Sequence, residues 1–106
     1  MSIEYYQDRI ESLKKQIERI KENWANETSN HNRRVEAYRG THTTSKPDKR
    51  ALEQEKRFWD RRKEDHAKEL AQVKKYLESA KAELAAAKEK EKVRKALEKA
   101  LAARKK

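Results

Sequence analysis

The sequence predicts an all-α fold, an antiparallel two-helix coiled-coil hairpin with an extended C-terminal helical overhang. Two long segments carry apolar residues at helical spacing, a short segment between them holds the only glycine and the only proline, and the long segments match each other in an antiparallel register. Of the 106 residues, 45% are charged and 34% are hydrophobic. With so few apolar side chains, we expect no globular core around a catalytic cleft and therefore no enzyme.

The first predicted helix covers residues 2–38. Its first three heptads repeat apolar residues at alternating spacings of three and four, which is typical of a coiled-coil seam. Ser2 suits the N-cap, and Glu4 places a carboxylate near the positive end of the helix dipole. The seam positions are Ile3, Tyr6, Ile10, Leu13, Ile17, Ile20 and Trp24, and the register continues through Glu27, His31, Arg34 and Tyr38.

A turn is predicted at residues 39–48. Gly40 suits the C-cap of the first helix, and Pro47 suits the first turn of the next one, where a missing N–H costs nothing. We therefore expect the second helix to begin at residue 47. No glycine or proline follows, so the helix is expected to continue past residue 87 to the end of the sequence.

Two helices joined by a short turn pack antiparallel. The residue numbers of two facing residues, one on each helix, therefore add up to the same value along the whole hairpin, which we call the constant number sum. A sum of 90 places Trp24 opposite His66 and His31 opposite Trp59, and it centres the hairpin within the predicted turn. The predicted seam of the second helix is Leu52, Lys56, Trp59, Lys63, His66, Leu70, Val73, Leu77, Ala80, Leu84 and Ala87.

Polar residues interrupt this seam between the two tryptophans. Glu27 is expected to face Lys63, which is a favourable pair, whereas Arg34 is expected to face Lys56, the one layer with like charges. These layers are interpreted as setting the register of the hairpin.

The histidines do not predict a metal site or a general base. His31 and His66 lie on different helices about 10 Å apart along the rod, His42 lies in the turn, and the chain has no cysteine. We interpret the two seam histidines as rings that stack on tryptophans, with a pH-sensitive seam as the alternative. With no nucleophile and base pair and no glycine-rich loop, we expect no catalytic residue, no metal and no cofactor.

Residues 88–106 are predicted to form a basic amphipathic helical extension of the hairpin 2–87. Val93, Leu97 and Leu101 form an apolar stripe rotated away from the hairpin seam, and a lone helix of this length is marginal in water. We therefore expect a non-enzymatic structural or adaptor subunit that binds a protein partner, or a second copy, through this stripe. Phe58, beside the seam, is a further candidate contact because aromatic residues dominate interfaces.

The net charge of +10 is unevenly distributed along the chain. Residues 1–38 hold 7 basic and 7 acidic side chains and residues 51–87 hold 9 and 8, whereas residues 39–50 hold 4 and 1 and residues 88–106 hold 9 and 3. These two basic segments predict an alternative function, sequence-nonspecific nucleic-acid binding, because lysine and arginine neutralise phosphates without reading bases. The candidate residues are Arg39, Lys46, Lys49, Arg50, Lys88, Lys92, Arg94, Lys95, Lys99, Arg104, Lys105 and Lys106.

Two features bear on location. A membrane partner is not expected, and neither a signal peptide nor a transmembrane segment is predicted. We expect the protein to act in the cytoplasm or within a macromolecular assembly.

A chain of about a hundred residues with an aromatic residue, any residue and glycine at the turn of a helical hairpin is similar to the WXG100 secretion proteins. The residues that carry this resemblance are Tyr38, Arg39 and Gly40. Tyr38 stands where the family has tryptophan, and Ala80 replaces the acidic residue expected four positions after Tyr76. The resemblance implies a secretion-associated hairpin as a minor alternative.

Overall fold

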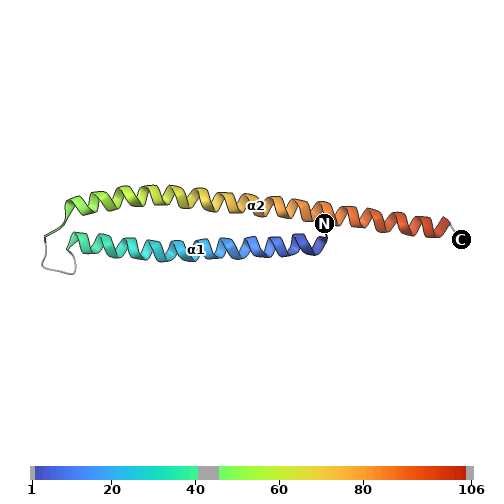
Figure 1. Cartoon of the computed structure of the whole chain (residues 1–106), viewed down its shortest axis with the longest axis horizontal. Coiled ribbons are helices and arrows are strands. Elements are labelled where there is room, and N and C mark those ends of the chain that lie inside the picture. Colours follow the sequence, from blue (N-terminus) through green and yellow to red (C-terminus); the bar gives the residue numbers. More distant parts are fainter. Residues whose placement is uncertain (1, 41–45, 105–106) are drawn as a thin grey trace. The chain divides into compact units, whose positions relative to one another are not determined.

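The computed structural model describes residues 2–40 and 46–104, and over these residues the chain forms two α-helices and no strand (Figure 1). Helix α1 covers Ile3–Arg39 and helix α2 covers Lys49–Arg104. The predicted all-α helical hairpin is confirmed. The chain divides into two units, one of Met1–Lys15 with Val73–Lys106 and one of Gln16–Gln72, and each helix contributes to both.

Both ends of α1 carry the predicted caps. At the start, the Ser2 hydroxyl accepts a hydrogen bond of 3.2 Å from the backbone N–H of Tyr5. At the end, Gly40 has a φ of 72° and its N–H donates to the carbonyl of Ala37 at 3.2 Å. A residue with a Cβ is disfavoured at this left-handed φ, so glycine allows the helix to end here.

Helix α2 begins two residues later than predicted. Asp48, not a residue before Pro47, is the N-cap, because its carboxylate accepts a hydrogen bond of 3.1 Å from the N–H of Ala51. Aspartate is a strong cap, whereas a helix starting at Pro47 would be capped by lysine, which is a poor one. The N–H of Asp48 also donates to the carbonyl of Tyr38 at 2.8 Å, which joins the end of α1 to the start of α2. The predicted turn residue His42 lies outside the described residues.

Replacing Asp48 with alanine is expected to lower the free energy of unfolding by about 1 kcal/mol, because the first turn of α2 loses its side-chain cap. Urea denaturation followed by circular dichroism at 222 nm measures the change. The matched control is Glu53→Ala, which removes a carboxylate from an exposed position of the same helix. An equal loss in both variants would contradict the capping role.

In the unit of residues 1–15 and 73–106, apolar side chains from both helices form the core. Leu13 of α1 and Val73, Leu77 and Ala80 of α2 are buried. Alanine among these larger side chains allows the two helices to approach closely.

Helix α2 continues past the N-terminus of α1 in this same unit (Figure 1). Where α1 begins, a surface cavity is lined by Ser2, by Ile3 of α1 and by Ala86, Ala87 and Arg94 of α2. From Ala87 α2 runs on to Arg104, about 25 Å at the helical rise per residue. The predicted helical overhang is therefore confirmed, although α2 has no break at residue 87 that would mark a separate segment.

The inward-facing positions of the N-terminal part of α2 differ from the prediction by one residue. Glu55 is buried, with 8% of its surface exposed, and Arg62 is partly buried, whereas Lys56 and Lys63 are exposed. Lys56 would have placed a second positive charge opposite Arg34. Glu55 supplies a carboxylate there instead, so the predicted like-charge layer was wrong.

Candidate functional surfaces

Four aromatic rings form one continuous stack inside the unit of residues 16–72. The centroid distances are 4.2 Å from His31 to Trp59, 4.7 Å from Trp59 to Trp24 and 4.0 Å from Trp24 to His66, with interplanar angles of 4°, 7° and 7°. Two of these contacts, Trp24 with His66 and His31 with Trp59, are the pairs that the register predicts, and they are confirmed. Both tryptophans are partly buried, so they pack between the helices and are not available as free anchors.

Glu55 lies beside His31 at one end of this stack, and two side chains of α1 donate hydrogen bonds to its carboxylate. Its Oε1 accepts a hydrogen bond of 2.9 Å from Nδ1 of His31 and one of 2.7 Å from Nε of Arg34. Burial alone would raise the pKa of the Glu55 carboxyl, but the hydrogen bonds and positive charge of His31 and Arg34 outweigh it and lower the pKa below 4.5. The carboxylate is therefore a fixed negative charge between the helices.

A second ion pair joins the helices beside the other tryptophan. The guanidinium of Arg62 donates to Oε1 of Glu27 through Nε at 3.2 Å and through Nη2 at 3.1 Å, and Nη2 lies 3.0 Å from Oε2. Cζ of Arg62 also lies 5.7 Å from the ring centroid of Trp24, within the range of a cation–π contact. Glu27 was expected to pair with Lys63, which instead lies 3.4 Å from Asp60 on its own helix.

Phe58 is exposed, as the sequence predicts, with 52% of its surface accessible. Cζ of Arg34 lies 6.0 Å from its ring centroid. A shallow surface depression surrounds the ring and is lined by Arg57, Arg61 and Asp65 among others. Its role as a partner contact stays a prediction.

The predicted stripe on the C-terminal part of α2 is fully formed and exposed. Val93, Leu97 and Leu101 have 50%, 60% and 56% of their surface accessible. A shallow, open depression on this surface is lined by Ala86, Lys90, Val93 and Leu97 among others. The structure therefore places all three predicted stripe residues on one accessible surface of the helix.

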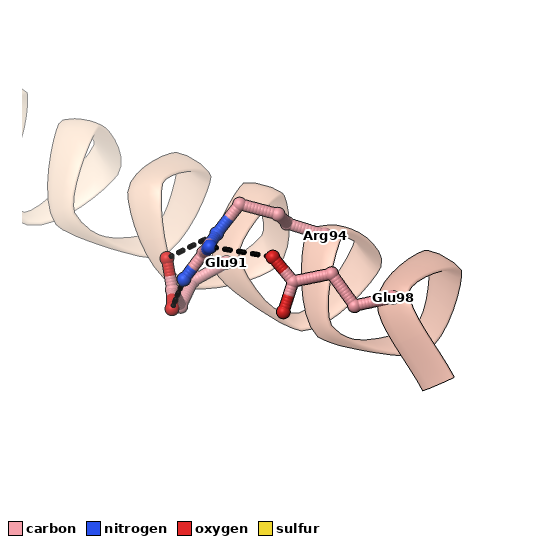
Figure 2. Close-up of polar contacts among 3 residues, drawn as sticks. All are labelled: Glu91, Arg94 and Glu98. Carbon is pink, nitrogen blue, oxygen red and sulfur yellow. Dashed lines mark hydrogen bonds and ion pairs between the residues drawn. The ribbon is translucent and has the colours of Figure 1, made fainter. Parts of the chain in front are cut away.

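An ion-paired triad that the sequence reading missed lies next to this stripe (Figure 2). Arg94 donates to both oxygens of Glu91, at 2.6 Å from Nη2 and 3.3 Å from Nε, and to Glu98 at 2.8 Å from Nη1. The hydrogen bond and charge of Arg94 lower the pKa of Glu91, and the two carboxylates raise the pKa of Arg94 above its ordinary value. The signal for this triad was the spacing of three and four residues between opposite charges on a helix.

The remaining cations that were predicted to bind nucleic acid fall into two groups. In the unit of residues 16–72, Arg39, Lys46, Lys49 and Arg50 are exposed near the bond that joins Asp48 to Tyr38. In the other unit, the predicted cations of the overhang besides Arg94 that the structure describes are exposed and lie on α2, namely Lys88, Lys92, Lys95, Lys99 and Arg104. Lys105 and Lys106 lie outside the described residues.

Within residues 2–40 and 46–104, no three His, Asp or Glu side chains gather as ligands of one metal ion would. Neither described helix is both long and apolar enough to cross a membrane. Comparisons with family models, with curated proteins and with solved structures found no match. The resemblance to WXG100 proteins accordingly stays a prediction.

Proposed function

We propose that the protein is a non-enzymatic structural or adaptor subunit whose helical hairpin acts as a coiled-coil spacer and whose overhang binds a protein. The observation that carries this proposal is the exposed stripe of Val93, Leu97 and Leu101 on a helix that continues beyond its intramolecular partner. The spacing of four residues between successive stripe members is that of an amphipathic helix that docks by one face into an apolar groove or onto another helix.

The Glu91, Arg94 and Glu98 triad supports this proposal. Ion pairs three and four residues apart stabilise an isolated helix by a few tenths of a kcal/mol each at exposed sites. The triad therefore favours the helical form of the overhang before it meets a partner, which reduces the ordering that binding requires. A preformed helix loses less conformational entropy on association than a disordered segment does.

Replacing Leu97 and Leu101 with glutamate is expected to abolish association, because two charges would have to be desolvated at the contact. Size-exclusion chromatography with light scattering measures self-association of the full chain. Affinity capture from the source cells after nuclease treatment, with the wild type and the variant compared, measures binding to other proteins.

The matched control is Ala102→Glu, compared with the single variant Leu97→Glu. Ala102 is exposed on the same segment, about 140° around the helix from Leu97, so it adds the same charge away from the stripe. We expect the control to associate like the wild type. Equal loss in both single variants, or the absence of any association of the wild type, would contradict the proposal.

Sequence-nonspecific nucleic-acid binding is the second candidate function. It is favoured by the charge of the described overhang, residues 88–104, which carries seven cations and three carboxylates. Two of those carboxylates are bound by one of the cations, Arg94. Action in the cytoplasm or inside a larger assembly is consistent with either candidate.

A further inference from the structure

Four lysines of the overhang lie in one row along α2. Lys88, Lys92, Lys95 and Lys99 follow one another at spacings of four, three and four residues, so they lie on the same face of the helix. All four are exposed. At the helical rise of 1.5 Å per residue the row is about 16 Å long. We refer to these four residues as the lysine row.

The three carboxylates of the same segment lie to either side of the lysine row. Glu91 and Glu98 project about 70° and 90° from the centre of the row, and both contact Arg94 (Figure 2). Glu89 projects about 90° from the centre on the other side. The charge of Lys95 lowers the pKa of Glu91 less than Arg94 does. Both oxygens of the Glu91 carboxylate accept hydrogen bonds from Arg94, not from Lys95. Among the described residues, no ion pair involves a member of the lysine row. The row therefore carries four positive charges without bound carboxylates.

The lysine row and the apolar stripe lie on opposite faces of α2. At about 100° per residue, the centre of the row is about 170° from the centre of Val93, Leu97 and Leu101. A ligand bound along one face leaves the other face accessible. The overhang can thus hold a protein and a polyanion at the same time.

We propose that the lysine row binds the phosphate backbone of double-stranded nucleic acid while the stripe on the opposite face binds protein. This inference rests on the second candidate function and assigns it to four residues. Lysine contacts a phosphate as a point charge without a required geometry, which suits a regular series of phosphates read by charge alone. The row contains no asparagine, glutamine or aromatic side chain, so it recognises backbone and not base sequence.

The alternative polyanion is an acidic protein surface. Arginine binds carboxylates and phosphates alike through the two parallel hydrogen bonds of its planar fork, whereas lysine binds phosphate as a point charge. In this segment the one arginine beside the row, Arg94, is already occupied by Glu91 and Glu98, and the row itself consists of lysine alone. The charge arrangement therefore favours phosphates.

The test is the salt dependence of binding of the full chain to a 20-base-pair duplex of random sequence, measured by fluorescence anisotropy between 50 and 300 mM salt. Four phosphate contacts predict a slope of log K against log salt of about −3.6. The double variant Lys92→Gln with Lys95→Gln is expected to reduce this slope to about −1.8. The matched control, Lys75→Gln with Lys90→Gln, removes two exposed positive charges from the side of α2 that carries the stripe and is expected to leave the slope unchanged.

Four other outcomes of these measurements would each contradict a different part of the proposal. Equal reduction of the slope by the two double variants would overturn the lysine row and leave nonspecific nucleic-acid binding in place. No binding of the wild-type chain would overturn both. If poly-L-glutamate competes with the duplex equally well per charge, the row binds carboxylates and the proposal for phosphates is wrong. Leu97→Ser with Leu101→Ser is expected to leave duplex binding intact, and loss of binding in that variant would contradict the assignment of two separate faces.

Discussion

Replacing Trp59 with alanine is expected to lower the free energy of unfolding by about 3 kcal/mol, the lower end of the range for tryptophan-to-alanine changes because the ring is only partly buried. Trp59 lies between His31 and Trp24, so its removal breaks two of the three ring contacts in the stack. Each such contact contributes about 0.5 to 1.5 kcal/mol beyond the burial of area. The cavity left between the helices adds the rest.

Phe58 is the matched control for this change, because it is the neighbouring aromatic residue on the same helix and is exposed. Phe58→Ala is expected to cost below about 1 kcal/mol, the loss of an exposed contact with Arg34. Urea denaturation followed by circular dichroism gives both values, and near-ultraviolet circular dichroism reports on the stacked rings directly. If the two alanine variants are equally destabilised, the stack does not stabilise the hairpin.

Heptad spacing and turn residues were enough to predict the hairpin. Ser2 and Gly40 mark the ends of α1, and the constant number sum places Trp24 against His66 and His31 against Trp59, as in the structure. These predictions succeed because helical periodicity fixes which face of each helix is buried. In an antiparallel pair, one correct layer then fixes the next.

The polar layers were harder to predict because apolar spacing does not identify them. At the end of the aromatic stack, the constant number sum placed Lys56 inward, whereas the structure buries Glu55. The like charges of Arg34 and Lys56 were the signal of the error, since a shift of one residue brings a carboxylate to Arg34. In this section electrostatic pairing, which apolar spacing does not encode, identifies which polar residues of α2 face α1.

In the overhang, too, apolar spacing predicts the exposed apolar residues but not the ion pairs. Apolar spacing predicts the exposed stripe, but charge alone predicts Arg94 as a nucleic-acid contact. The structure pairs Arg94 with Glu91 and Glu98. A count of charges therefore overstates the binding surface, because it does not say which cations already have partners.

Replacing Glu55 with glutamine is expected to lower the free energy of unfolding by about 1.5 to 3 kcal/mol near neutral pH, the range for hydrogen bonds to charged groups. The buried carboxylate holds His31 and Arg34 through one oxygen, at 2.9 Å and 2.7 Å. Glutamine keeps the shape and one acceptor but loses the charge. The guanidinium of Arg34 then loses the negative charge that faces it.

The same carboxylate makes stability depend on pH in a defined direction. The pKa of Glu55 is lowered in the folded state from 4.5, so the native chain binds this proton less readily than the unfolded chain. The stabilisation is fully present above about pH 4.5 and is lost as the pH falls through the lowered pKa of the folded state. Glu55→Gln removes this contribution, so the difference in the free energy of unfolding between wild type and variant is expected to shrink as the pH falls below 4.5.

Glu53→Gln, an exposed change two residues away, is the control and is expected to leave the wild-type pH profile unaltered. A difference between the wild type and Glu55→Gln that stays constant from pH 3 to pH 7 would show that the charge of Glu55 does not stabilise the fold.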